Sequence, residues 1–212
     1  MTSKFHRMVC GRCSAFPSAQ GLVIFAHGSG SGRLSPRNQH VAAALRQAGI
    51  ATLLLDLLTP SEERDRANVF DIDLLAQRLA VATEWARTQP DTASLPVGYF
   101  GASTGGGAAL VAASRQRDRI GAVVSRGGRP DLAGAALETV QAPTLLIVGS
   151  LDTQVIALNE QALARLSCEK EISVVPGASH LFEEPGTLDV VVQLATAWFG
   201  RHLAAGGPAP RS

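Results

Sequence analysis

Short apolar runs alternate along the chain with longer segments in which apolar residues recur every three to four positions. Such a recurrence is typical of a helix with one buried face, whereas a short apolar run predicts a buried strand. In chain order, the predicted strands are Leu22–Ala26, Ile50–Leu55, Val97–Phe100, Ile120–Ser125, Pro143–Val148 and Glu171–Val175. The pattern therefore predicts an α/β fold with a sheet of about six strands.

The predicted strands are mostly continuous apolar runs, not alternations of apolar and polar residues. Continuous runs indicate burial on both faces, which is typical of a mostly parallel sheet with helices on both sides. In such a sheet, ligands bind at the carboxyl ends of the strands. The residues that directly follow each strand are therefore the first candidates for chemistry.

The chain has 212 residues, of which 46% are hydrophobic, and its net charge is +1. This length fits one domain, which we place at residues 21–203. An irregular segment, 1–20, precedes this domain, and a Gly/Pro-rich tail, 204–212, that we expect to be disordered follows it. The near-neutral charge gives no support for nucleic acid or a membrane surface as a partner. No apolar run approaches the roughly 18 residues of a membrane helix, and no secretory signal is recognisable.

The three cysteines are an odd number, which argues against a disulfide framework and fits a reducing compartment. We therefore expect a cytoplasmic protein. Cys10 and Cys13 form a C-x-x-C motif, but zinc would need two more ligands and only Cys168 remains. No helical run follows the motif, so a thioredoxin-like role is not indicated. We expect neither a metal nor another cofactor.

The segment Gly101–Gly105 has the form G-x-S-x-G and lies between a predicted strand and a run of small helix-forming residues. In a nucleophile elbow, the chain turns so sharply from strand to helix that the residues two before and two after the serine must be nearly free of side chain. The serine is then held in a strained conformation with its hydroxyl exposed. The motif predicts Ser103 as a nucleophile.

A serine nucleophile needs a base, and histidine is the usual one. His180 follows the sixth predicted strand and so lies at the same sheet edge as the elbow. The base in turn needs a carboxylate to orient it, and Asp152 follows the fifth strand. Two alternatives remain open: Asp152 could instead cap the next helix, and Asp131, after the fourth strand, is a second candidate acid.

A glycine- and serine-rich loop, His27–Gly32, follows the first predicted strand. Small residues let backbone N–H groups point into a site, so Ser29 or Gly30, together with Thr104, are expected to form an oxyanion hole. We expect His27 to be structural. A dinucleotide site would also place a glycine-rich turn here, but the spacing G-x-G-x-x-G is not met from either glycine.

Together, these motifs in the order Ser103, Asp152, His180 resemble an α/β-hydrolase of the dienelactone-hydrolase-like branch. The resemblance covers about residues 21–203. Relatives in this branch usually carry cysteine as the nucleophile, so Ser103 favours a serine esterase. These relatives also usually open with an antiparallel pair of strands, but residues 1–20 show no strand pattern. Without such strands, one edge of the sheet would be exposed and could pair with a second copy of the chain.

The connection between Ser125 and Pro143 is short enough for only one small helix, which predicts a site without a cap domain. The segment Thr59–Asn68, rich in Glu and Arg, is expected to form one rim. Arginines at the expected site are candidates for binding a substrate carboxylate, with internal ion pairs as the alternative. These arginines are Arg126, Arg129 and Arg33.

The sequence therefore predicts a serine hydrolase that cleaves a small acyl ester or a lactone through an acyl-enzyme. Three alternatives remain. The same three residues could serve acyl transfer or peptide cleavage, or they could act on lactones or phosphotriesters. The third is a non-enzymatic binding protein with the same fold.

Overall fold

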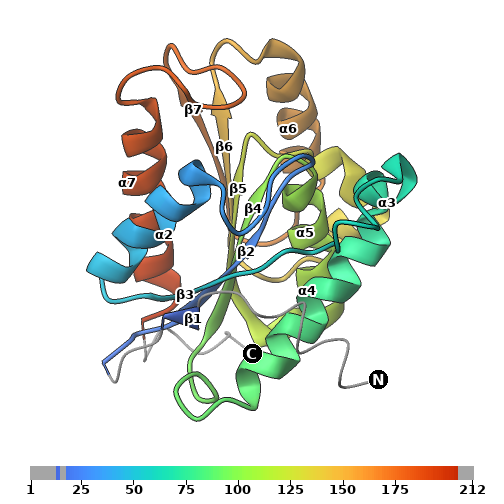
Figure 1. Ribbon diagram of the computed structural model, residues 1–212. Helices are drawn as coiled ribbons and strands as arrows, with labels where there is room; N and C mark the ends of the chain where they lie inside the picture. Colours follow the sequence, from blue (N-terminus) through green and yellow to red (C-terminus); the bar gives the residue numbers. More distant parts are fainter. Residues whose placement is uncertain (1–12, 15–17, 205–212) are drawn as a thin grey trace.

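The computed structural model describes residues 13–14 and 18–204, which form one central sheet with helices on both faces (Figure 1). The strands are β1 (Cys13–Ser14), β2 (Leu22–Ala26), β3 (Ala51–Leu54), β4 (Val97–Ala102), β5 (Ile120–Arg126), β6 (Thr144–Gly149) and β7 (Lys170–Val175). The helices are α2 (Pro36–Gln47), α3 (Arg66–Phe70), α4 (Ile72–Arg87), α5 (Thr104–Gln116), η1 (Arg117–Arg119), η2 (Pro130–Thr139), α6 (Thr153–Arg165) and α7 (Thr187–His202).

The sheet has the order β1-β3-β2-β4-β5-β6-β7, and all pairs are parallel except β1 with β3. The six strands predicted from the apolar runs are all present, so the mostly parallel α/β fold is confirmed. From β2, the chain first adds β3 on one side and then crosses to add β4 on the other side. As a result β4, the strand that leads into the predicted elbow, lies in the middle of the sheet. Its carboxyl end is flanked by the loops that follow β2 and β5.

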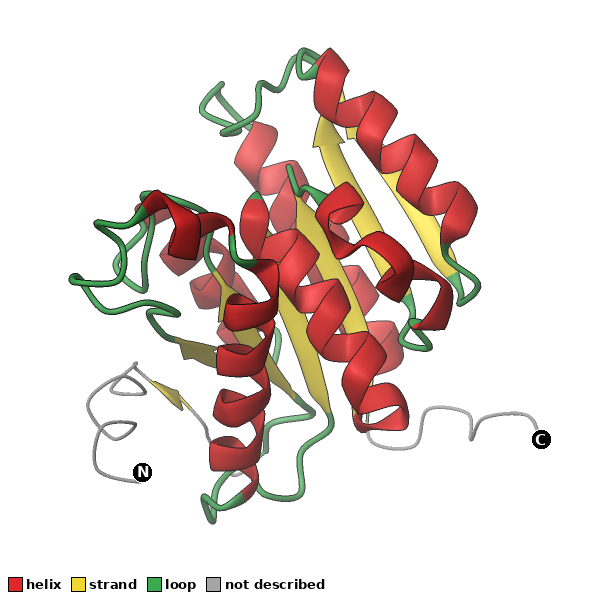
Figure 2. Ribbon diagram, turned by 90° about the vertical axis from the view of Figure 1, so that its right-hand side faces the viewer, coloured by secondary structure: helices red, strands yellow, loops and turns green. Residues whose placement is uncertain are grey.

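Two apolar layers sandwich the sheet, as Figures 1 and 2 show. On one face, α2 and α7 cover residues such as Phe25 and Phe100, whose rings lie 5.0 Å apart. On the other face, α4, α5, η2 and α6 cover residues such as Ile24 and Tyr99. Neighbouring residues of one strand thus enter opposite layers, which explains why the strands are apolar throughout.

The amino-terminal segment differs from the prediction at one point. Cys13 and Ser14 form a two-residue strand that pairs with Leu53 and Thr52 of β3. A strand this short has no periodicity to detect, and it covers part of the sheet edge that was expected to be exposed. The predictions for Cys10 and for the tail beyond Ala204 lie outside the described residues. Pairing with a second copy stays a prediction.

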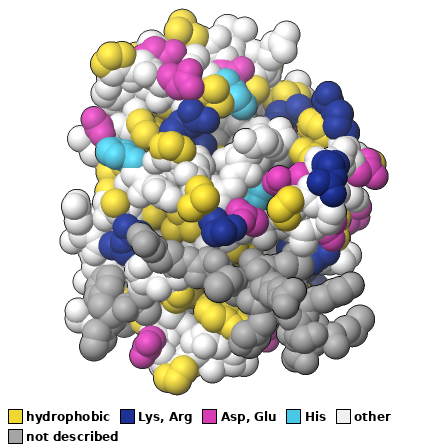
Figure 3. Space-filling model, in the orientation of Figure 1, with side chains coloured by type: hydrophobic (Ala, Val, Ile, Leu, Met, Phe, Trp, Pro, Cys, Tyr) yellow, Lys and Arg dark blue, Asp and Glu magenta, His cyan; other side chains and the backbone are white. Residues whose placement is uncertain are grey.

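The connection from β5 to β6 contains only η2, which is kinked at Gly134 with a φ of 54°. Within residues 18–204, no cap domain covers the sheet edge, as the short spacing predicted. On the rim, α3 begins inside the segment that was expected to be a loop. None of the helices described here is both long and apolar enough to cross a membrane. In Figure 3, basic and acidic side chains are interspersed on the visible face, without a large patch of one sign.

Candidate active site

Ser103 occupies the turn between β4 and α5 with a φ of 51° and a ψ of −123°. This region is strained for a residue with a side chain, and such strain is typical of functional turns. The flanking glycines are required by space: a Cβ on Gly101 would lie 2.5 Å from the carbonyl oxygen of Gly105. A Cβ on Gly105 would overlap the carbonyl oxygen of Ala26. The backbone therefore has the geometry that the motif predicted.

Replacing Gly105 with alanine is expected to lower the free energy of unfolding by about 3 kcal/mol, because the new methyl group meets backbone that cannot move aside. Gly200→Ala is the matched control, since a Cβ at Gly200 in α7 meets nothing within 4 Å. That change is expected to stabilise the protein by about 0.5 kcal/mol through helix propensity. Urea unfolding of both variants checks this, and equal free energies would contradict the crowded turn.

His180 and Asp152 meet at the carboxyl ends of β6 and β7. Nδ1 of His180 lies 2.6 Å from Oδ2 of Asp152, so the ring donates to the carboxylate. Asp152 holds the N-cap position of α6, yet its side chain accepts no hydrogen bond from that helix. The alternative role as a helix cap is therefore not what the carboxylate does. On the other side of His180, the N–H of Ser179 donates to Glu184 at 3.0 Å, which fixes the loop.

The loop after β2 packs directly against the nucleophile turn. A Cβ on Gly28 would lie 2.7 Å from Cβ of Ser103, so only glycine allows this approach. Within the described chain, no group accepts a hydrogen bond from the backbone N–H of Ser29 or Gly30. Thr104 is the first residue of α5, and an N–H at that position has no partner inside its own helix. These donors suit a developing negative charge near Ser103.

His27 is structural, as expected. Its Nε2 accepts a hydrogen bond of 2.8 Å from the N–H of Leu57, and Nδ1 lies 3.0 Å from the carbonyl oxygen of Gly28. The ring therefore ties the loop that carries Ser29 to the segment after β3. Burial lowers the pKa of His27 below its ordinary value of 6.5, although the bond to Gly28 and the charge of Glu63 act in the opposite direction.

The lowered pKa of His27 predicts a loss of stability in acid. The unfolded chain takes up a proton near pH 6.5, whereas the folded chain takes it up only at lower pH. The free energy of unfolding should therefore fall as the pH drops below 6.5 towards the folded-state pKa. In His27→Gln, whose amide oxygen can still accept from Leu57, this dependence should become weaker. Urea unfolding at several pH values checks it, and an unchanged slope would contradict a neutral, buried ring.

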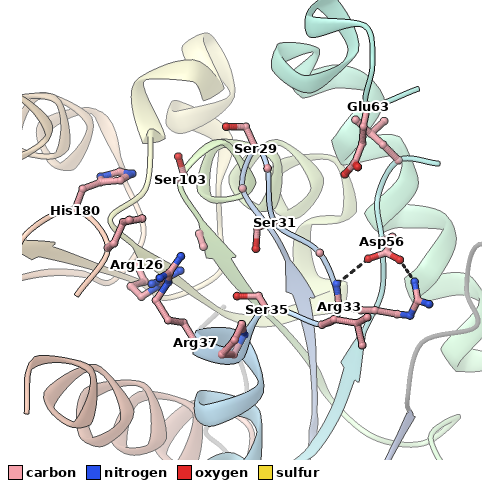
Figure 4. Close-up of a pocket in the computed structure, with 18 of the residues that line it drawn as sticks. Ser29, Ser31, Arg33, Ser35, Arg37, Asp56, Glu63, Ser103, Arg126 and His180 are labelled. Carbon is pink, nitrogen blue, oxygen red and sulfur yellow. Dashed lines mark hydrogen bonds and ion pairs between the residues drawn. The ribbon is translucent and has the colours of Figure 1, made fainter. Parts of the chain in front are cut away.

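A pocket of about 670 Å³ opens above Ser103 and His180. Figure 4 shows the side chains of both residues beside this pocket. Arg126 and Arg33 also line it, as the sequence predicted, but Arg33 forms an ion pair with Asp56. The pocket is further lined by Glu63, which belongs to the segment predicted to form one rim, and by Arg37 and Asp56, which were not predicted as site residues.

The other predicted arginine, Arg129, does not line this pocket. Its guanidinium forms two hydrogen bonds with Asp131, at 2.8 and 2.7 Å, which is the internal ion pair considered as the alternative. The backbone N–H of Arg129 donates to the carbonyl oxygen of Ser103 at 3.0 Å. Arg129 therefore supports the turn through its backbone, and Asp131 is engaged away from His180. In the part of the chain that is described, His, Cys, Asp and Glu side chains form no cluster suited to a metal ion.

Two curated relatives from Mycobacterium tuberculosis, from strains CDC 1551 and H37Rv, are each 62% identical to this chain over 200 residues. Both relatives carry the name of a phosphoribosyl transferase. The match covers 94% of this chain but only 45% of each relative, so the chain spans less than half of their length.

Among solved structures, a dienelactone hydrolase from Anabaena variabilis is 55% identical, with a TM-score of 0.86 over 91% of this chain and 99% of that one. A monoacylglycerol lipase from Paleococcus ferrophilus shares the fold, with a TM-score of 0.73 at 17% identity over 91% of this chain and 99% of that one. The model of the dienelactone hydrolase family matches residues 19–199. With this match and the elbow geometry, the chain belongs to the dienelactone hydrolase family.

Proposed function

We propose that this member of a hydrolase family is a serine hydrolase that cleaves small carboxylic esters or lactones. The observation that carries the proposal is the 2.6 Å contact between Asp152 and His180 beside the strained turn of Ser103. An imidazole held by a carboxylate can take a proton from a serine hydroxyl, and the turn presents that hydroxyl to the pocket. This arrangement supports acyl transfer through a covalent intermediate.

In the proposed reaction, Oγ of Ser103 attacks the ester carbonyl while His180 accepts the hydroxyl proton. Asp152 stabilises the imidazolium that forms. The negative charge on the carbonyl oxygen is held by the N–H groups of Thr104 and of Ser29 or Gly30. The tetrahedral intermediate then collapses, and His180 gives its proton to the alcohol that leaves. Water, activated by the same imidazole, hydrolyses the acyl-enzyme and restores Ser103.

The shape of the pocket supports hydrolysis of a small substrate. The described part of the chain forms no cap domain over the pocket, which leaves water a path to the position of the acyl group. Besides Ser103, three serines and several charged residues line the pocket, interspersed with leucines. A long aliphatic acyl chain would have to lie against some of these charged and hydroxyl groups, which disfavours its binding. We therefore expect activity to fall as the acyl chain lengthens.

The test is turnover of a p-nitrophenyl ester series from acetate to octanoate, with simple lactones and a phosphotriester measured in parallel. Turnover that is highest for short acyl esters supports the proposal. In addition, a fluorophosphonate should add one covalent group, which peptide mass mapping should place on Ser103. Labelling of another residue would contradict the assignment of the nucleophile. Turnover of the phosphotriester alone would favour that alternative over ester hydrolysis.

The names of the mycobacterial relatives suggest a different reaction, transfer of a phosphoribosyl group. That activity is not part of the proposal, because the names refer to proteins of which this chain matches only 45%. Acyl transfer to an acceptor other than water and peptide cleavage use the same chemistry of Ser103. Product analysis with added alcohols and amines, and with a peptide substrate, separates them from hydrolysis.

A further inference from the structure

Arg126 is a buried cation beside the nucleophile. It is the last residue of β5 and pairs in register with Ala102, the residue before Ser103. Only 7% of its surface is exposed, although the side chain lines the pocket. Its Nε and Nη1 atoms are buried, and neither has a hydrogen-bond partner among the described residues. A buried guanidinium without such partners is costly, so its place at the pocket calls for an explanation.

Among the residues that the structure describes, no acidic side chain forms an ion pair with Arg126. Its guanidinium lies 5.8 Å from the centre of the Phe182 ring, an attraction much weaker than an ion pair. Burial, and then the neighbouring charge of Arg37, lower the pKa of Arg126 to about 10, which leaves it protonated at neutral pH. Two cations are thus placed within electrostatic reach of each other at one end of the pocket.

Arg37 reaches this end from the first turn of α2. Its Nη1 donates to Glu183 at 3.0 Å on the solvent side, while its Nε is buried without a partner in the described part of the chain. Figure 4 shows the guanidinium groups of Arg37 and Arg126 at one end of the pocket, with Asp56 and Glu63 at the other. Three guanidinium nitrogens without a partner among the described residues therefore come from two separate elements, a strand end and a helix start.

We propose that this end of the pocket, Arg126 and Arg37 with the hydroxyls of Ser31 and Ser35, binds a phosphate group carried by the substrate. The inference rests on the proposed function, since the group belongs to the same molecule as the scissile ester. A phosphate monoester has a charge close to −2 and three oxygens pointing in different directions. It can neutralise Arg126 and also meet the side of Arg37 that faces away from its ion pair with Glu183. A carboxylate has one charge and two oxygens in a plane, so it meets fewer of these donors.

The position of Arg126 limits the size of such a substrate. Neighbouring strands in a sheet lie about 4.8 Å apart, and Arg126 is in register with the residue before the nucleophile. A phosphate bound there lies a short distance from an ester carbonyl at Ser103. The substrate class is therefore a small ester or lactone with a phosphate a few atoms from its carbonyl group. The competing outcome is a substrate carboxylate, which the sequence predicted at Arg126, Arg129 or Arg33.

Binding is tested first without catalysis, by thermal unfolding with inorganic phosphate. In wild type and in Ser103→Ala, 20 mM phosphate is expected to raise Tm by about 3 °C more than sodium acetate of equal ionic strength. In Arg126→Met and in Arg37→Gln, this difference should be at least halved. Arg165→Gln, which removes an exposed arginine paired with Glu138 outside the pocket, is the matched control and should keep the full difference.

Each result decides for or against the proposal. An equal shift in all variants would mean that phosphate acts on the protein at large, and no shift in any of them would mean that no site exists. A larger shift with acetate would mean a carboxylate site. Each of these three results overturns the proposal. Because Arg37 is partly exposed, Arg37→Gln keeps the test decisive even if Arg126→Met fails to fold.

Activity provides the second arm of the experiment. Phosphate is expected to inhibit hydrolysis of p-nitrophenyl acetate competitively, with an inhibition constant at least tenfold higher in Arg126→Met. Hydrolysis of this neutral ester should change less than threefold in Arg165→Gln, the matched control outside the pocket. If the protein hydrolyses no ester but phosphate still shifts Tm through Arg126, the proposed function fails while the phosphate site remains. Non-competitive inhibition would overturn the phosphate site.

Discussion

Ser103→Ala is expected to lower kcat for p-nitrophenyl acetate by roughly 10⁶-fold, because the alanine methyl group cannot attack the carbonyl. The backbone should keep its shape, since alanine fits the same turn. The residual rate of the variant would come from direct attack of water on the ester, assisted by the oxyanion donors. Steady-state kinetics on the purified variant, with circular dichroism to verify folding, provides the measurement.

The control for this loss is Ser61→Ala, which removes an exposed hydroxyl near Thr59 on the rim. It should retain activity within about threefold, because surface substitutions away from the chemistry have small effects. If Ser103→Ala hydrolysed the ester as fast as wild type, another group would have to be the nucleophile. The assignment of the elbow as the reaction centre would then be wrong.

Asp152→Asn is expected to lower kcat by about 10³- to 10⁴-fold at neutral pH. An amide has nearly the same shape as the carboxylate, but it carries no charge to stabilise the imidazolium. It can also donate to Nδ1 of His180, which then leaves Nε2 protonated and unable to act as a base. The effect should fall on kcat more than on KM, since the carboxylate does not touch substrate.

Asp131→Asn separates the two candidate acids. Asp131 is bound to the guanidinium of Arg129 at 2.8 and 2.7 Å, whereas the carboxylate bonded to His180 is that of Asp152. Its replacement should therefore change kcat less than tenfold. A larger loss in Asp131→Asn than in Asp152→Asn would reverse the assignment. Both variants are compared with wild type on the same short-chain ester.

The sequence predicted the sheet well because both faces of each strand are buried, which leaves an unbroken apolar run. It also predicted the turn at Ser103, since the two glycines are imposed by contacts with backbone that no side chain could relieve. Local pattern and fold agree at these positions. Where a residue has two physically reasonable roles, the pattern does not decide between them, as Asp152 and the arginines illustrate.

Arg126 and Arg129 illustrate the limit. They are three residues apart, and the sequence marks both as candidates. In the structure, β5 continues one residue further than predicted and includes Arg126, so its side chain enters the pocket beside the elbow. Gly127 then turns with a φ of 50°, and Arg129 faces Asp131 instead. This distinction depends on the last residue of a strand, which apolar periodicity does not define.

Arg37 was missed for a related reason. A polar residue in the first turn of a helix is usually a solvated surface position, and nothing in its neighbours suggests otherwise. Its role depends on the start of α2 lying beside the end of β5, which is a property of the sheet order. The strand Cys13–Ser14 is a similar case, because its only signal is the edge of β3 that it pairs with.

The position of Asp152 at the start of α6 has a consequence for how the protein can evolve. Aspartate is among the best helix caps, and a cap contributes about 1 kcal/mol, yet here the carboxylate turns away from the helix towards His180. If Asp152 acts as proposed, the fold gives up stability at this position in exchange for chemistry. A serine or asparagine at this position could accept a hydrogen bond from the first turn of α6 and so cap the helix. Selection for thermodynamic stability alone, without selection for turnover, would therefore favour variants that have lost the carboxylate.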